Sequence, residues 1–313
     1  MSIPSGSVHP GFVRAALAGA LTILVLVGVV SGEPAMSSVA APAVPASRSG
    51  IGASCVSLAD RMAIAVADAA AEGDVVGIAF IDRESGVYLG AGDSDVTFPA
   101  ASVAKLFIAD DYLYRNAAAA GPGGAVLGGV VTMLASSDDG PAELLWMSGG
   151  GPEVIARVAG RYALSATSAV GAWWDTAVTA ADVARYYDGL LSGDGGLPES
   201  ARRLMIAGLQ ASGPVAADGF EQDFGVWAML ERLGGPGIKQ GWMATRDRTI
   251  RHSTGFAGHD HRYVLVELTD LDVGSPSVAD DIANADAGDR ATAIFEAAFP
   301  ADITESAACA STS

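Results

Sequence analysis

Cysteine is nearly absent from this chain, which has only two in 313 residues, Cys55 and Cys309. A framework of several disulfides is therefore excluded. In an exported protein such a sparse, even pair predicts one disulfide, which here would tie the start of the folded part to its end. Two unpaired thiols are the alternative, because the sequence alone does not show that the two ends are close.

Basic residues are also scarce. The 18 lysines and arginines are outnumbered by 36 aspartates and glutamates, which gives a formal net charge of -18 and a pI of about 4.4. This charge argues against nucleic acid and against anionic lipid as partners, since both need a basic surface. The simplest role of the acidity is solubility.

No apolar run reaches the ~20 residues that span a membrane comfortably. Residues 15–30 are apolar, Arg14 precedes them and small residues follow, a pattern typical of a secretory signal. We therefore expect a signal peptide or uncleaved anchor over residues 1–40, an Ala/Pro/Ser-rich linker over 41–54, and an extracellular or envelope location. A lipid anchor needs a cysteine directly after the apolar run, and Cys55 lies too far along the chain.

Metal-ligand clusters and phosphate-binding loops are missing too. His259 and His261 flank Asp260 at an expected tight turn and lack further ligands at suitable spacing. The glycine-rich run 121–129 has no lysine and no strand-to-helix setting. We expect no metal and no organic cofactor.

The periodicity of the remaining chain predicts an α+β domain over residues 55–313. A helix is expected over 57–71, a hairpin over 74–90, a mainly helical section over 127–208, three strands at 237–243, 249–256 and 262–268, and a last helix over 278–298. This order implies one antiparallel sheet built from both ends of the chain (55–100 and 237–313), with a helical part (101–236) inserted between them.

One short motif carries candidate chemistry. Ser102 and Lys105 lie three residues apart at an expected helix start, so the amine should lie beside the hydroxyl. A serine becomes a good nucleophile when a neighbouring group takes its proton, and a lysine whose pKa is lowered by burial can do so. Ser102 is the candidate nucleophile, although such a pair also occurs on ordinary solvated helix faces.

Two later segments extend this motif into a family pattern. Ser137-Asp138-Asp139 resembles the S-D-N element of class A β-lactamases and penicillin-binding proteins, and Lys239-Gln240-Gly241 resembles their K-T-G element on an expected strand. The resemblance covers roughly residues 55–300. It implies a three-layer α/β/α fold with a five-stranded antiparallel sheet.

The resemblance also implies roles for individual residues. Ser102 would attack a carbonyl, Lys105 would help to deprotonate it, and Ser137 would relay a proton to the leaving group beside Lys239. The backbone N–H groups of Ser102 and Trp242 would form an oxyanion hole.

The departures from the family pattern concern three sites. The stretch 161–179, where class A enzymes carry a deacylating glutamate, has Asp175 as its only carboxylate, and we assign that residue to loop closure before a helix capped by Thr179. Asp139 replaces asparagine and is expected to pair with Lys105 or Lys239, which would hold these amines charged. Gln240 replaces the threonine whose hydroxyl binds the substrate carboxylate.

Further candidate substrate contacts are Asp139, Gln240, Gly241, His252 and one of Arg248 and Arg251, between which the sequence does not choose.

We expect a monomeric serine hydrolase or acyl-enzyme-forming protein that acts on a peptidoglycan-derived peptide or a small ester or amide, with poor β-lactam turnover. The alternative is a catalytically inactive envelope protein of the same fold that binds a ligand. A competent β-lactamase would require a replacement for the missing base.

Overall fold

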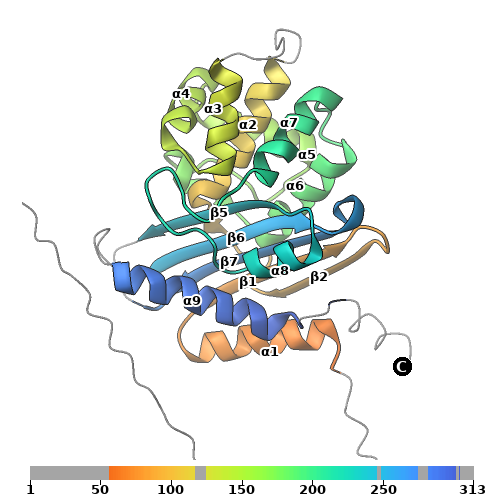
Figure 1. Ribbon diagram of the computed structural model, residues 1–313, viewed down its shortest axis with the longest axis vertical. Helices are drawn as coiled ribbons and strands as arrows, with labels where there is room; N and C mark the ends of the chain where they lie inside the picture. Colours follow the sequence, from red (N-terminus) through yellow and green to blue (C-terminus); the bar gives the residue numbers. More distant parts are fainter. Residues whose placement is uncertain (1–55, 117–124, 245–247, 274–280, 301–302, 304–313) are drawn as a thin grey trace, which may run out of the picture. The chain divides into compact units, whose positions relative to one another are not determined.

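The computed structural model describes residues 56–116, 125–244, 248–273, 281–300 and 303. Its main sheet has the order β2-β1-β7-β6-β5, and every neighbouring pair is antiparallel (Figure 1). The strands are β1 (Val75–Asp82), β2 (Val87–Gly92), β5 (Gly237–Ala244), β6 (Thr249–Ala257) and β7 (Tyr263–Leu271). The predicted five-stranded sheet from both ends of the chain is thus confirmed.

Helices from both ends of the chain cover one face of this sheet. They are α1 (Leu58–Ala71), α8 (Trp227–Leu233) and α9 (Asp281–Ala298), and their apolar residues share one core cluster with β1 and β7 (Figure 1). Ser57 caps α1 by accepting a hydrogen bond from the backbone N–H of Asp60. No helix was expected at 227–233, and the sequence pattern assigned this stretch to the inserted helical part. In the structure, α8 packs on the opposite face of the sheet.

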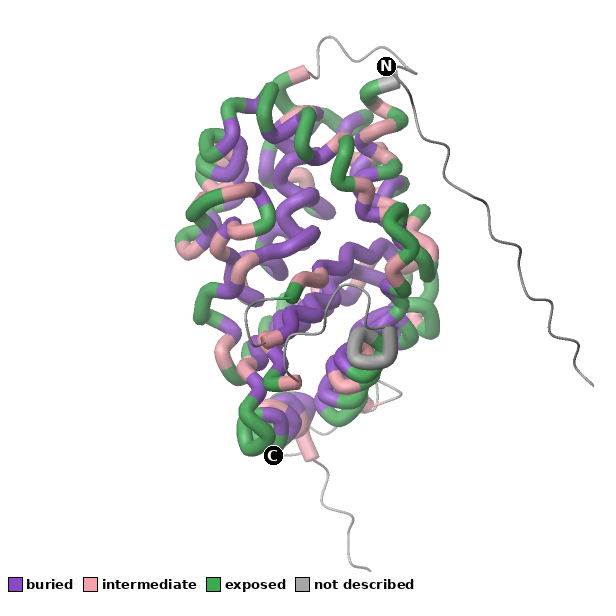
Figure 2. Tube along the Cα trace, turned by 90° about the vertical axis from the view of Figure 1, so that its left-hand side faces the viewer, coloured by how far each residue is buried: buried purple, intermediate pink, exposed green. Residues whose placement is uncertain are grey.

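The inserted segment forms the other layer. It contains a short 3₁₀ turn, η1 (Ala101–Ala104), that continues into α2 (Lys105–Arg115), followed by α3 (Ala125–Ala135), α4 (Asp139–Gly149), α5 (Pro152–Tyr162), α6 (Ala180–Ser192) and α7 (Glu199–Gln210). Residues 105–111 of α2 are all buried, and α2 contacts α3, α4, α5 and α7, so it lies at the centre of this layer. Figure 2 shows the buried residues gathered inside the molecule and the exposed ones on its outside. A two-stranded sheet, β3 (Phe98–Pro99) with β4 (Ala177–Val178), lies just before the Ser102 turn and had not been predicted.

The two central strands are buried on both faces of the sheet. β6 is buried along its whole length and β7 along nearly all of it, because helices cover both faces of the sheet, so their sequences lack the alternation of a half-exposed strand. None of the described helices is long and apolar enough to cross a membrane. The apolar run 15–30, Cys55 and Cys309 lie outside the described residues, so the signal and the disulfide stay predictions.

A buried carboxyl group on β7 should make stability depend on pH. Glu267 pairs with Ser253 of β6 and is fully buried, and neither carboxyl oxygen finds a hydrogen-bond partner among the described residues. Burial raises the pKa of Glu267 well above its ordinary value of 4.5. Above about pH 4.5 the unfolded chain releases this proton while the folded chain retains it, so stability falls as pH rises toward the raised pKa.

Replacing Glu267 by methionine is therefore expected to stabilise the fold at neutral pH by about 1–3 kcal/mol, the usual cost of an unsatisfied buried polar group. The gain should shrink as pH is lowered toward about 4.5. Urea unfolding of both proteins across this range measures the difference. A gain that is the same at every pH would show that the ionisation of Glu267 does not contribute.

Candidate active site

Ser102 lies in the 3₁₀ turn η1, directly before α2. Ala101, just before it, has a φ of 47°, a sparsely populated value for a residue with a side chain. Such strain persists only where the surroundings enforce it, and it is concentrated at functional sites. In a 3₁₀ turn, residues three apart eclipse each other, which brings Lys105 directly over Ser102.

Lys105 is fully buried and lies at the centre of a cluster of polar groups. Its Nζ lies 2.7 Å from Ser102 Oγ, 2.7 Å from the carbonyl oxygen of Ser137 and 3.1 Å from Ser137 Oγ. The amine also donates to Asp139 Oδ1 at 2.5 Å and lies 4.8 Å from the ring centre of Trp173. The predicted pairing of Asp139 is thus with Lys105, and this ion pair joins a fully buried amine to a largely exposed carboxylate.

The Ser137 hydroxyl connects this amine to a second one. Lys239 Nζ on β5 lies 3.0 Å from Ser137 Oγ and 2.9 Å from the carbonyl oxygen of Gln240. Lys105 and Lys239 are the only lysines in the whole sequence, and both meet at this one hydroxyl. Ser137 itself has a φ of 58°, again a strained value.

Burial favours the neutral form of both amines. It lowers the pKa of Lys105 below the ordinary 10.5, and the hydrogen bond and charge of Asp139 partly oppose this effect. The pKa of Lys239 is lowered further, first by burial and then by repulsion from Lys105. Unlike arginine, a buried lysine can lose its proton, so the cluster can both accept a proton and return it.

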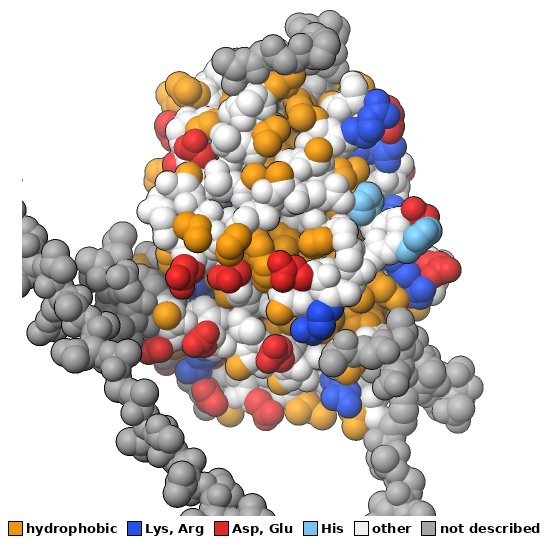
Figure 3. All heavy atoms as spheres, in the orientation of Figure 1, with side chains coloured by type: hydrophobic (Ala, Val, Ile, Leu, Met, Phe, Trp, Pro, Cys, Tyr) orange, Lys and Arg blue, Asp and Glu red, His pale blue; other side chains and the backbone are white. Residues whose placement is uncertain are grey.

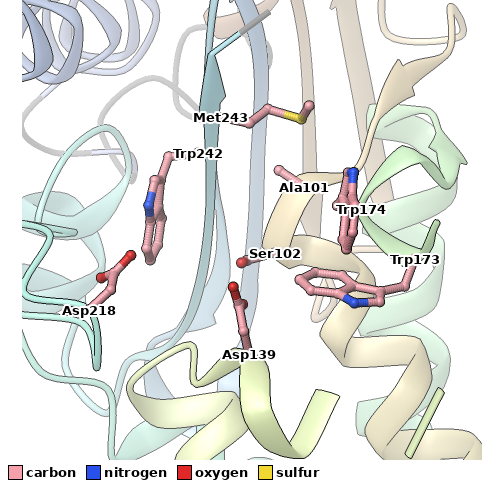
Figure 4. A pocket seen from close by; sticks show the side chains of 8 residues that line it. All are labelled: Ala101, Ser102, Asp139, Trp173, Trp174, Asp218, Trp242 and Met243. Carbon is pink, nitrogen blue, oxygen red and sulfur yellow. The ribbon is translucent and has the colours of Figure 1, made fainter. Parts of the chain in front are cut away.

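A cavity of about 150 Å³ opens above Ser102 (Figure 4). Trp242 forms one wall, Trp173 and Trp174 the opposite one, and the Ser102 hydroxyl lies between them. Gly241 allows β5 to approach this closely, because a Cβ there would lie 3.0 Å from the carbonyl oxygen of Ala100. The complete lining is Ala101, Ser102, Asp139, Trp173, Trp174, Asp218, Trp242 and Met243.

Comparison with known proteins shows which family the chain belongs to. No family model matches the chain. A curated protein of Mycobacterium tuberculosis named "Putative lipoprotein LppW" is 38% identical over 244 residues, which are 75% of this chain and 74% of the relative, and its Mycobacterium bovis counterpart matches equally well. The chain belongs to the LppW family.

Solved structures show the fold of this LppW-family protein. A β-lactamase from Xanthomonas campestris superposes with a TM-score of 0.60 at 19% identity, over 77% of this chain and 98% of that one. β-Lactamases from Chitinophaga pinensis (13% identity, 76% and 97% covered) and Streptosporangium roseum (16%, 77% and 99%) both give a TM-score of 0.59. The serine β-lactamase fold expected from the three motifs is thereby confirmed.

The segment 161–179 provides an aromatic wall in place of a base. Trp173 lines the cavity and donates from its Nε1 to Glu143 Oε2 at 3.2 Å. Asp175 does not line the cavity, and its carboxylate lies against Gly171. The helix α6 is capped as predicted, since the N–H of Asp182 donates to the Thr179 hydroxyl. No carboxylate of this segment therefore faces Ser102.

Gln240 does not take the place expected for a substrate contact. Its Nε2 donates to the carbonyl oxygens of Gln222 at 2.9 Å and Phe224 at 2.8 Å, and its Oε1 accepts from the N–H of Thr254. The side chain is buried with all of these groups engaged. Gln240 therefore clamps the segment 222–224 against the sheet, and the expectation is corrected.

His252 is likewise structural. Its Nε2–H donates to the carbonyl oxygen of Pro99 at 2.8 Å, and its Nδ1 accepts from the N–H of Thr269 at 3.1 Å. Full burial lowers the pKa of His252 to about 4, so the ring is neutral. The expected substrate contact is replaced by a tie between the sheet and β3, just upstream of Ser102.

The two candidate arginines have different surroundings. Arg248 bonds to Asp270 at 2.8 Å and to the carbonyl oxygen of Gly73, and it does not line the cavity. Arg251 is buried, with its guanidinium 5.1 Å from the ring centre of Phe220, and it borders a larger cavity next to Ser102. The structure thus places Arg251, and not Arg248, near the candidate site.

Asp218 is a site residue that the sequence reading missed. Its exposed carboxylate lines the Ser102 cavity below Trp242 (Figure 4) and accepts a hydrogen bond from the N–H of Phe220. Its charge raises the pKa of both Lys105 and Lys239 against the opposing effect of burial. The residue lies in an irregular loop, and no motif spacing marks it.

Proposed function

We propose that this protein is a serine acyl-transfer enzyme of the cell exterior, in which Ser102 accepts an acyl group from a cell-wall peptide or a small ester or amide. The observation that supports it most is the contact of Lys105 Nζ with Ser102 Oγ, 2.7 Å apart in a buried cluster beside an open cavity. The Ser137 hydroxyl, shared by the two lysines, provides a second proton carrier.

In this mechanism Ser102 Oγ bonds to the carbonyl carbon while its proton passes to the neutral amine of Lys105. The bond to the leaving group then breaks, and the leaving oxygen or nitrogen takes the proton of the Ser137 hydroxyl. Lys105, now an ammonium, returns a proton to Ser137 Oγ, so no proton is gained or lost. The N–H groups of Ser102 and Trp242 remain our proposed oxyanion hole, because both residues line the cavity.

Slow release of the acyl group follows from the segment 161–179, which directs no carboxylate toward Ser102. The two carboxylates that line the Ser102 cavity, Asp139 and Asp218, come from other segments, and Asp139 pairs with Lys105. Without a base in the place of the class A glutamate, an ester on Ser102 should be released slowly, so β-lactam turnover should be poor. A second candidate function is a ligand-binding protein without catalysis. The ion pair between Lys105 and Asp139 favours it, because this pair stabilises the protonated amine.

An exported location is part of the proposal. The mycobacterial relatives are named as lipoproteins, and residues 15–30 of this chain have the pattern of a secretory signal. No cysteine follows that run before Cys55, so we propose a signal peptide or a membrane anchor in place of a lipid.

Burst kinetics with 4-nitrophenyl acetate test the acyl-enzyme. We expect one equivalent of nitrophenolate to be released rapidly per protein molecule, followed by slow turnover, because acylation outpaces deacylation. Ser102→Ala should show no burst. Ser136→Ala, at a neighbouring serine whose hydroxyl donates to the carbonyl oxygen of Thr132, should keep it. A burst that persists in Ser102→Ala would reject Ser102 as the nucleophile.

A further inference from the structure

A second, larger cavity of about 830 Å³ adjoins the Ser102 cavity. Asp218, Trp242 and Met243 line both cavities. The second cavity is bounded by β5, the loop 218–224 and α9. It is large enough for the part of a substrate that lies beyond the reacting carbonyl.

Aromatic rings form a wall of this second cavity. Phe220 and Trp242 stack with ring centres 4.6 Å apart and planes 8° from parallel, and Phe224 packs edge-on against Phe220. In the Ser102 cavity, Trp173 and Trp174 face Trp242 from the other side (Figure 4). Indole and phenyl faces attract ammonium groups, and tryptophan does so best.

The charges along the second cavity are mostly negative. Four exposed carboxylates line it, and none pairs with a lysine or arginine in the part of the chain that the structure describes. The one cation in the lining, Arg251, is only 1% exposed and lies against the Phe220 ring. Acidic side chains are also spread over the molecular face in Figure 3. The four carboxylates are Asp218, Glu221, Asp223 and Asp289.

We infer that the second cavity binds a cationic part of the substrate, a primary or quaternary ammonium group, while the reacting carbonyl lies at Ser102. This inference rests on the proposed function for the position of the carbonyl. Trp242, which lines both cavities, supplies an aromatic contact for the cation, and the unpaired carboxylates supply the opposite charge. A substrate that carries a carboxylate at this place would meet repulsion from the same four side chains.

Three 4-nitrophenyl esters test the charge preference: those of 6-(trimethylammonio)hexanoic acid, heptanoic acid and adipic acid, whose chain ends are cationic, neutral and anionic. We expect the cationic ester to acylate Ser102 about tenfold faster than the neutral one, and the anionic ester to be the slowest. The preference should weaken as salt is added, because exposed charges are screened. Equal rates, or a preference for the anionic ester, would overturn the inference.

Variants test whether the carboxylates of the second cavity cause the preference for the cationic ester. Glu221→Gln together with Asp223→Asn should remove most of the preference for the cationic over the neutral ester. Asp68→Asn, which removes an exposed carboxylate on α1, is the matched control and should preserve the preference. A preference that survives the double variant would place the cation elsewhere.

A binding measurement separates this inference from the proposed function. Ser102→Ala protein is titrated with 6-(trimethylammonio)hexanamide and with heptanamide, and the indole fluorescence is recorded. Saturable binding of the cationic amide alone, lost in the double variant, supports the cation site even if Ser102 proves unreactive. No difference between the amides would reject the site even if Ser102 is readily acylated.

Discussion

Replacing Lys105 by methionine is expected to slow the acylation of Ser102 by about 10²–10⁴-fold, the usual contribution of a positioned general base. The amine lies 2.7 Å from Ser102 Oγ, and the only other lysine in the chain contacts Ser137 and not Ser102. Methionine fills a similar volume against Trp173 and cannot take a proton. The rate of nitrophenolate release in the first turnover measures the loss.

The control for this variant is Lys105→Arg, which retains a positive charge but does not lose its proton at accessible pH. It should be about as slow as Lys105→Met if Lys105 acts as a base. Recovery of most of the rate with arginine would show that Lys105 acts through its charge alone. Cooperative urea unfolding of both variants shows that they have folded.

Replacing Asp139 by asparagine is expected to have the opposite effect and to accelerate acylation. The hydrogen bond and charge of Asp139 raise the pKa of Lys105, so they favour the protonated amine, which is not a base. Without them the pKa of Lys105 falls, so the rate of acylation begins to rise at a lower pH. Each unit of this shift increases the rate about tenfold at a pH below the midpoint, because tenfold more amine is neutral.

The measurement is the pH dependence of the first-turnover rate for wild type and Asp139→Asn. Asp138→Asn is the matched control, because Asp138 caps α4 through the N–H of Gly140 and asparagine can retain that cap. Its charge also raises the pKa of Lys105, but less than that of Asp139, so a smaller shift is expected. If the midpoint of the pH profile is the same in Asp139→Asn as in wild type, the ion pair between Lys105 and Asp139 does not limit Lys105 as a base.

The sequence predicted those parts of the structure that depend on local periodicity and motif spacing. The three late strands, the first and last helices and the cap at Thr179 follow from apolar patterns and capping residues, and the structure contains them. The pairing of Asp139 with a lysine of the candidate site was also expected from the sequence, which offered Lys105 and Lys239 as partners.

The predictions that were wrong concern side-chain direction and irregular segments. Gln240 and His252 lie on strands whose place near Ser102 was correctly expected, but their hydrogen-bond partners at Gln222 and Pro99 are distant in sequence. Asp218 lies in a loop, where no period indicates which way a side chain points. Such contacts depend on tertiary packing, which a motif does not encode.

The most direct test of the account is intact-mass spectrometry after incubation with a fluorescent penicillin and with a small fluorophosphonate, followed by peptide mapping. The account predicts a stable adduct of one probe molecule per protein, located on Ser102 and absent from Ser102→Ala. The adduct should persist for long times, because the segment 161–179 brings no base to the cavity. Absence of an adduct with both probes would contradict the acyl-enzyme and leave a ligand-binding protein with the serine β-lactamase fold.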